Sequence, residues 1–323
     1  MRPLSLMRQL LMVILVAVPV VLPKDADAQA QVNDDPGGLM VYDFNIHKME
    51  DDWPAWIQYV QDGDLPKPDI LLVQDMPSLA GRLEFQEELE RIWGGKWIGR
   101  GHATGWHVAV IWRDERFTGG KTRTWWGFGD PNRDDDSPRC VDRPDGSSRD
   151  VNNGAPAVQV RLYDEVGEHY VSAVSFKSSP RSTTNCPWFN ARKVDRKLHN
   201  KHWSGGMLLM GTDANERDLD PETREWRCWY AGVSSGVDQP GCDGGVNLGY
   251  ADPIYDLCGG ERECLLGEMH ATHRNKGGTK LSRIDYIFGR LRSGIPGTSM
   301  QETMPWGDPE YSDHRAIRAF FAY

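Results

Sequence analysis

The sequence predicts an α/β fold in which two packed β-sheets form the centre and helices cover both outer faces. Two observations support this: short apolar runs recur along the chain, and one-sided helical patterns fall between some of them. Roughly 290 residues remain after the N-terminal segment, which is enough for one large domain or two small ones. No stretch has the composition of a dividing linker, so we expect one domain.

The predicted strands are apolar runs that are rich in β-branched residues. Several of them are continuous rather than alternating, which indicates strands that are buried on both faces. The runs are Leu39–Ile46, Ile70–Gln74, Val108–Trp112, Ala157–Leu162, Tyr170–Phe176, Met207–Gly211, Ile284–Phe288 and Ala316–Ala322.

Two segments have the apolar spacing of helices. Glu84–Trp93 places Phe85, Leu89 and Ile92 along one stripe, and Asn190–Trp203 begins at a plausible N-cap and ends before a Gly-Gly pair. Gly-Gly pairs, such as the pair at 119–120, are expected to form turns. Residues 131–153 are polar and rich in turn formers, which indicates an exposed loop.

The N-terminal residues have the pattern of an export signal. Arg2 and Arg8 precede the apolar run Leu10–Leu22, and Ala26-Asp27-Ala28 provides a cleavage pattern. The run is shorter than the roughly 20 apolar residues that span a bilayer. We expect a signal peptide over residues 1–28 and a secreted or periplasmic protein, with an uncleaved anchor as the alternative.

The chain is acidic, with a formal net charge of −10. Cleavage after residue 28 removes three basic and two acidic side chains, so the net charge becomes −11. An acidic surface repels a polyanion at long range, which excludes a stable, non-specific nucleic-acid complex. It does not exclude an enzyme that touches a few phosphates through a bound cation.

All six cysteines follow the predicted cleavage site, and an even count in an exported protein favours disulfides. No C-x-x-C motif is present, which makes a structural zinc site unlikely on sequence grounds. We expect three bridges, namely Cys258–Cys264, Cys228–Cys242 and Cys140–Cys186. Four of these cysteines lie in residues 216–264, which we interpret as a disulfide-stapled insertion.

Polar residues adjoin the ends of the predicted strands. Singly, such a residue is commonly a turn former or a cap, but the repetition at successive strand ends favours a functional site. Carboxylates and amides without clustered Cys or His suit a hard cation such as Mg²⁺, Mn²⁺ or Ca²⁺. The residues are Asn45, Asp75, Asp213, Asn215, Asp285, Asp313 and His314.

In these motifs the sequence resembles the endonuclease/exonuclease/phosphatase superfamily, to which deoxyribonuclease I belongs. Asn45 matches the Asn of that family's first strand, and Asp75 takes the place of its metal-binding Glu. GTDAN, RIDYIF and SDHRAI match, in order, its G-D-x-N, D-Y-I and S-D-H motifs. ATHRNKGGTKLSRIDYIF looks most like the nuclease subunit of cytolethal distending toxins. The resemblance covers residues 38–323 and implies a four-layer α/β/β/α sandwich of mostly antiparallel sheets.

The resemblance also implies a mechanism. A cation held by Asp75, Asn45 and Asp313 would neutralise charge on the scissile phosphate. Asp213 would orient or deprotonate the attacking water. Asn215 would donate a hydrogen bond to a phosphate oxygen. His314, oriented by Asp285, would bond to the phosphoryl oxygens and stabilise the pentacovalent state.

The chain departs from the family pattern at two of its positions. Asp75 is one methylene shorter than the usual Glu, so a cation must shift or be reached through water. Lys177 stands where the deoxyribonuclease I branch has a second His, and lysine binds phosphate as a point charge. Arg192 and His273 are further candidates for substrate binding, and a surface salt bridge is the alternative for Arg192.

We therefore expect a monomeric, divalent-metal-dependent phosphodiesterase whose substrate is nucleic acid. The alternatives are a phosphatase or sphingomyelinase-like phospholipase of the same fold, which would act on a membrane lipid, or a binding protein that has lost turnover. Basic grooves suit a polynucleotide and exposed aromatic loops suit a membrane, and residues 216–264 are both aromatic and acidic.

Overall fold

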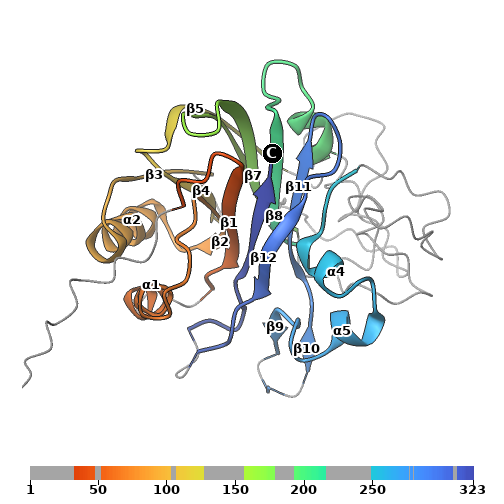
Figure 1. The fold of residues 1–323 in the computed structure, drawn as a ribbon. Coiled ribbons are helices and arrows are strands. Elements are labelled where there is room, and N and C mark those ends of the chain that lie inside the picture. Colours follow the sequence, from red (N-terminus) through yellow and green to blue (C-terminus); the bar gives the residue numbers. More distant parts are fainter. Residues whose placement is uncertain are drawn as a thin grey trace, which may run out of the picture.

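The computed structural model describes residues 33–47, 52–102, 107–126, 156–178, 193–215, 249–275, 277–278, 280–307 and 311–323. They form an α/β fold with two mixed, mostly antiparallel sheets of six and five strands, packed face to face (Figure 1). This confirms the predicted fold class.

The six-stranded sheet has one parallel pair, β1 with β2, at its centre. Its other neighbouring strands are antiparallel. In spatial order the strands are β12 (Thr298–Thr303), β13 (Ile317–Ala322), β1 (Gly38–Asn45), β2 (Ile70–Met76), β4 (His107–Arg113) and β3 (Trp97–Gly101).

The five-stranded sheet is built in the same way, with β7 and β8 as its parallel pair. A short pair, β9 (His273–Arg274) and β10 (Leu281–Ser282), lies at the end of the sandwich away from the C-terminus (Figure 1). In spatial order the five strands are β11 (Asp285–Leu291), β8 (Met207–Asp213), β7 (His169–Lys177), β6 (Pro156–Asp164) and β5 (Phe117–Trp126).

Alternate residues of the central strands form the core between the sheets. Leu39 and Val41 of β1 pack with Val171 of β7 and Leu209 of β8, and all four are fully buried. The opposite faces of the same strands are also buried, because helices cover them. This double burial is why the strands have continuous apolar sequences.

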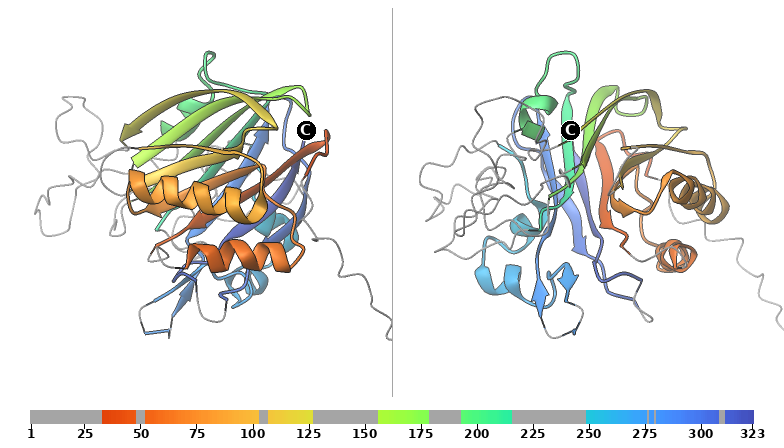
Figure 2. Two further views of the ribbon diagram at one scale, coloured as in Figure 1. Left: turned by 90° about the vertical axis from the view of Figure 1, so that its left-hand side faces the viewer. Right: turned by 180° about the vertical axis from the view of Figure 1, so that it is seen from behind.

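Helices α1 (Trp53–Asp62) and α2 (Leu79–Trp93) lie side by side on the outer face of the six-stranded sheet (Figure 2). Trp56 of α1 and Phe85 of α2 meet in the cluster beneath them. On the outer face of the five-stranded sheet, Val194 and Leu198 of the helical residues 193–198 pack against the sheet. The four layers that the resemblance implied are therefore present.

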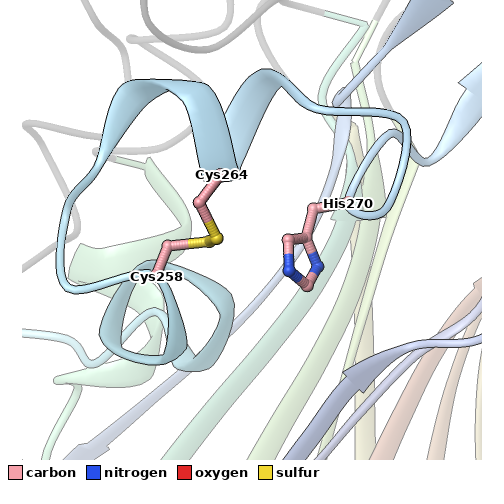
Figure 3. Close-up of side chains that lie close together, drawn as sticks. All are labelled: Cys258, Cys264 and His270. Carbon is pink, nitrogen blue, oxygen red and sulfur yellow. A yellow bond between two sulfur atoms is a disulfide. The ribbon is translucent and has the colours of Figure 1, made fainter.

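The short helix α4 (Pro253–Leu257) packs beside β12, and the predicted Cys258–Cys264 disulfide joins its end to the next short helix, α5 (Arg262–Leu266). The two sulfurs are 2.06 Å apart, and the side chain of His270 lies beside them (Figure 3). Because both sulfurs are in the disulfide, they are not thiolate ligands for a metal. The other four cysteines lie outside the described residues.

The sequence expectations missed or misread several elements. Gly119 and Gly120 do not form a turn but a bulge inside β5, where their φ angles are 96° and 91°. Helix α1 was not expected, although Trp53, Trp56, Ile57 and Val60 follow a helical spacing and are buried. Strands β3 and β12 were not expected either. The segments 1–28, 131–153 and 216–248 lie outside the described residues.

A network of charged side chains closes the end of the sandwich at the C-terminus. Arg116, only 1% exposed, lies between Asp69 and Asp164, with guanidinium-to-carboxylate distances of 3.1 and 2.9 Å. Its remaining N–H groups donate to backbone oxygens of residues 33, 35 and 38. The hydroxyl of the C-terminal residue, Tyr323, donates to Asp164 at 2.6 Å. This network fastens the N-terminal segment to both sheets.

No helix among the described residues is long and apolar enough to cross a membrane.

Candidate active site

The inward-facing residues of the central strands change from apolar to polar toward the end that carries β9 and β10. On β1 the series is Leu39, Val41, Asp43 and Asn45, and all four are buried. On β8 it ends in Gly211 and Asp213, on β7 in Ser175 and Lys177, and β11 begins at Asp285. The candidate site is thus a continuation of the inter-sheet core, which explains why its charged groups are rigidly placed.

A polar layer lies directly beneath the charged groups. The Nε2 atom of Gln74 donates to Asp43 at 2.7 Å and to Ser175 at 3.2 Å. Burial raises the pKa of Asp43 well above its ordinary value. A Cβ at position 211 would collide with the Asp43 carboxylate, so Gly211 is required for this close approach between the sheets.

Asp213 lies at the centre of the site and is fully buried. Its Oδ2 accepts from Asn45 Nδ2 at 2.9 Å and lies 3.1 Å from Lys177 Nζ. Its Oδ1 accepts from the backbone N–H of Asn215 at 3.0 Å. A carboxylate has about four acceptor positions, and these contacts use three of them. Asp213 is therefore held in one orientation by groups from β1, β7 and its own strand end.

His314 and Asp285 form a buried ion pair beside Asp213. His314 Nδ1 lies 2.8 Å from Asp285 Oδ2 and 3.0 Å from Oδ1, and its Nε2 lies 3.5 Å from Asn45 Nδ2. Burial opposes the charged imidazolium, but the Asp285 carboxylate outweighs it and raises the pKa of His314 to about 9. Burial raises the pKa of Asp285 to about 6 against the pull of His314. The imidazolium and the carboxylate stabilise each other in their charged forms, with Nδ1 donating to the carboxylate.

Backbone contacts fix this pair from both sides. The Thr272 hydroxyl oxygen accepts from the backbone N–H groups of Ile284 and Asp285, both at 3.0 Å. The Ser312 hydroxyl oxygen accepts from the backbone N–H of His314 at 3.0 Å. Thr272 belongs to the Thr-His-Arg segment and Ser312 to the S-D-H motif, so a hydroxyl group from each motif fixes the backbone that carries the pair.

Lys177 joins Asp75 to Asp213. Its ammonium group makes a short contact with Asp75 Oδ2, and the Lys177 side chain is 9% exposed. Burial alone would lower the pKa of Lys177, but Asp213 and Asp75 outweigh burial and raise it above the ordinary value. Asp75 has a φ of 55° at an irregularity of β2, a left-handed conformation that Asp tolerates better than most residues. Its Oδ1 is buried and has no hydrogen-bond partner among the described residues.

The other predicted residues lie around this centre. Asp313 Oδ1 is 3.1 Å from His47 Nδ1, and the ring of His273 is 4.7 Å from that of His314, centroid to centroid. The Asn215 amide donates one N–H to the Ser178 carbonyl at 2.8 Å. Arg192 lies outside the described residues.

The structure therefore gathers the predicted strand-end residues into one site, while their catalytic and binding roles stay predictions. The sequence reasoning missed His47 and Asp43. Asp43 was detectable as an acidic residue inside an otherwise apolar strand, Leu39-Met-Val-Tyr-Asp-Phe-Asn45. Nothing in the sequence around His47 indicates that it contacts Asp313.

Contacts within the site already occupy the predicted ligands of a divalent cation. Asp75, its principal predicted ligand, is already neutralised by the Lys177 ammonium, and Asp313 is engaged by His47. Asp213, Asp285 and His314 are close enough together to hold a metal ion, but Asp285 and His314 already form an ion pair. Asp75 Oδ1 has no partner among the described residues, but the Lys177 ammonium on the other oxygen opposes a cation bound directly to this carboxylate. A Mg²⁺ cofactor stays a prediction.

Comparison with known proteins rests on structure, because no protein-family model and no curated protein sequence matches the chain. A zebrafish (D. rerio) TDP2 structure in complex with a single-strand DNA product is 15% identical with a TM-score of 0.57, over 88% of this chain and 99% of that one. An endonuclease/exonuclease/phosphatase from Bacteroides vulgatus is 14% identical with a TM-score of 0.54, over 88% and 98% of the chains. The chain has the endonuclease/exonuclease/phosphatase fold.

A third structure of this fold has a different printed activity. It is a mannosyl-6-phosphatase from Bacteroides thetaiotaomicron, which is 15% identical with a TM-score of 0.52 over 88% of this chain and 100% of that one. At such identities the likeness shows the fold alone, so the activity must be argued from the chain's own side chains.

Proposed function

We propose that this protein is a phosphoric-ester hydrolase, and specifically a phosphodiesterase that cleaves nucleic acid. One observation carries the proposal: Asp213 is held between Lys177 and Asn45, beside the His314–Asp285 pair, at one end of an endonuclease/exonuclease/phosphatase fold. This set brings a base, two cationic groups and amide donors together in one site.

The proposed reaction is hydrolysis by a water molecule. Asp213 orients the water and accepts its proton as the new O–P bond forms. The P–O bond to the leaving group breaks, and the leaving oxygen takes a proton from the His314 imidazolium. Asp285 keeps Nδ1 of His314 engaged, so that the opposite nitrogen, Nε2, faces the site.

Charge stabilisation comes from groups that are already in place. The phosphoryl oxygens gain negative charge in the transition state, and fixed donors in a water-poor site stabilise such charge strongly. Lys177 and His314 supply positive charge, and Asn45 and the second N–H of the Asn215 amide supply neutral donors. Because these groups lie at strand ends, little reorganisation accompanies the reaction.

Nucleic acid is the proposed substrate because basic side chains lie beside the site, although the chain as a whole is acidic. His273 and Arg274 of β9 are half-buried next to His314, and Arg274 lies over the Trp306 ring at 4.6 Å. The DNA product in the TDP2 structure supports this choice. The more specific likeness to the nuclease subunit of cytolethal distending toxins rests on the motif at residues 271–288 and remains part of the proposal.

A phosphomonoesterase is the second candidate, since a mannosyl-6-phosphatase has the same fold. The same base and cationic groups would serve a terminal phosphate, and a phospholipase would use them at a lipid surface. The three substrate classes differ in what surrounds the phosphate, so a direct comparison of substrates separates them.

The test is an assay of the purified protein on plasmid DNA, RNA, a sugar phosphate and sphingomyelin vesicles. Each is incubated with Mg²⁺, with Mn²⁺ and with a chelator. We expect cleavage of DNA or RNA, and loss of that cleavage in Asp213→Asn, which keeps the side-chain shape. Asp114→Asn, at an exposed position on the far end of the sandwich, is the matched control. Absence of hydrolysis of every substrate under every condition would refute the proposed function.

We also propose that the protein is exported and acts as a monomer. The N-terminal pattern Arg2 to Ala28 supports export. Sequencing the N-terminus of the mature protein and measuring its mass in solution test the two statements. An N-terminus at Met1 in an exported protein, or a dimer mass, would contradict them.

A further inference from the structure

Lys177 stands where two carboxylates of the site would otherwise face each other. It ends β7 and is the register partner of Asp213 in the parallel β7–β8 pair. Its ammonium contacts Asp75 Oδ2 and lies 3.1 Å from Asp213 Oδ2, so one positive charge serves two negative charges. Removing this charge would leave two buried carboxylates close together without compensation, which is strongly unfavourable.

The same contacts disfavour a second cation. A divalent ion bound to Asp75 would lie close to the ammonium, and the repulsion between them is twice that between two single charges. The ion would also have to displace Lys177 from a buried carboxylate before it could coordinate directly. Lys177 therefore competes with a divalent ion for the Asp75 carboxylate.

Lys177 also has the chemistry of a phosphate ligand. An ammonium is a compact positive charge with several N–H donors, and it binds anionic phosphate oxygens as a point charge. Asp213, the proposed base, shares this ammonium, so a phosphoryl oxygen bound by Lys177 lies next to the proposed water. A fixed cation at this point would provide the charge neutralisation that a bound metal ion would otherwise provide.

We propose that Lys177 is the resident cation of this site: its ammonium neutralises Asp75 and Asp213, binds a non-bridging phosphate oxygen, and takes the place of a tightly bound divalent ion. The proposal rests on the proposed function for the role toward phosphate. Lys177 keeps its proton throughout, since the water's proton goes to Asp213 and the leaving oxygen is protonated by His314. Hydrolysis then proceeds without added metal.

Metal binding tests the proposal without any activity assay. Mn²⁺ is titrated into the full mature chain, and free Mn²⁺ is followed by electron paramagnetic resonance. We compare wild type with Lys177→Met, which keeps the length but removes the charge, and with Lys177→Arg, which keeps the charge. Lys96→Met is the matched control, because Lys96 is an exposed lysine that pairs with Asp114 on the far end.

We expect weak Mn²⁺ binding by wild type, Lys177→Arg and Lys96→Met, and binding at least about tenfold tighter by Lys177→Met, because two carboxylates lose their counter-charge. Equal affinities in wild type and Lys177→Met would overturn the proposal. If circular dichroism shows that Lys177→Met does not fold, wild type decides alone: saturation at micromolar Mn²⁺ overturns the proposal, and its absence supports it.

Hydrolysis in a chelator gives a second readout. We expect wild type to retain its rate within about twofold after exhaustive chelation, since no step uses a metal ion. Complete loss of that rate, restored by Mg²⁺, would overturn the proposal. If wild type hydrolyses nothing under any condition, the proposed function fails, and the Mn²⁺ titration still decides whether Lys177 excludes the metal.

Discussion

Two buried cations, at opposite ends of the same sandwich, each bridge two carboxylates. At the C-terminal end Arg116 lies between Asp69 and Asp164, and at the site end Lys177 lies between Asp75 and Asp213. The arrangements share charge and burial but differ in the remaining contacts. Arg116 also binds three backbone carbonyls, whereas one oxygen of Asp75 has no partner within the described part of the chain.

The comparison shows that a buried cation shared by two carboxylates can stabilise the fold at one end of the molecule and serve a site at the other. The planar guanidinium has five donors in a fixed arrangement, and the surrounding oxygens match it, so Arg116 fastens segments together. The ammonium of Lys177 is a compact charge on a flexible stem, and the two contacts described for it are with carboxylates, those of Asp75 and Asp213. The Asp75 oxygen at the site end that has no described partner can still accept a hydrogen bond, whereas the contacts of Arg116 at the other end serve the fold.

The largest expected effect is on catalysis at the site end. His314→Ala removes the proposed acid and its charge, and we expect the hydrolysis rate to fall by at least about 10²-fold. The midpoint of thermal unfolding should fall as well, because Asp285 stays buried without its partner, and breaking a buried pair costs about 3–5 kcal/mol. Steady-state kinetics and a melting curve check both statements. A variant with wild-type rate would remove His314 from the mechanism.

The second effect is on stability at the C-terminal end. Arg116→Met leaves Asp69 and Asp164 buried without their shared cation, and breaking such a pair costs about 3–5 kcal/mol of the free energy of unfolding. Urea unfolding measures the cost. The rate of the remaining folded protein should equal that of wild type. Arg91→Met, at an exposed helical position, is the control that should change neither quantity. A loss of activity in folded Arg116→Met would weaken the comparison.

A smaller effect is expected for Asp75→Asn. Asn tolerates the left-handed backbone at this position as well as Asp does, so the change tests charge rather than strain. Lys177 loses one of its two carboxylates but keeps Asp213, and we expect the rate to fall about tenfold, as is typical for residues that orient a catalytic group. Stability should fall less than in Arg116→Met. A loss as large as that of His314→Ala would show that Asp75 acts directly.

The smallest effect is a pH dependence at the C-terminal end. Burial opposes ionisation of Asp164, but its bonds from Arg116 and Tyr323 outweigh burial and hold its pKa below the ordinary value. A depressed carboxyl pKa stabilises the folded state above the unfolded-state value of about 4, and the benefit is lost as pH falls through the folded-state pKa. The unfolding free-energy difference between wild type and Asp164→Asn should therefore be constant from pH 7 to 5 and shrink toward pH 3. A constant difference down to pH 3 would contradict this.

Much of the fold was predictable because burial leaves a direct mark on sequence. Strands β1, β2, β7 and β8 are covered on both faces, and their apolar runs identified them. Strand β5 was missed because it is polar and contains Gly119-Gly120, whose bulge conformation resembles a turn in sequence. Helix α1 was missed because Trp and Val suit strands as well as helices.

The candidate site was predictable in its members but not in its contacts. Strand-end Asp and Asn residues are visible one strand at a time. The pairing of Lys177 with Asp75 depends on how the two sheets face each other and on the irregular end of β2, which no local pattern encodes. The contact of His47 with Asp313 likewise joins residues that are far apart in the chain.

Lys177, Asp213 and Asp285 are register partners on three adjacent strands, so they form one row across the sheet. Neighbouring strands lie about 4.8 Å apart, and this interval sets the spacing of the three charges independently of the connecting segments. Sequence change in those segments can alter which molecule reaches the row without altering the row itself. A single-residue deletion within β8 would have the opposite result, since it turns Asp213 to the outer face and abolishes the row at once.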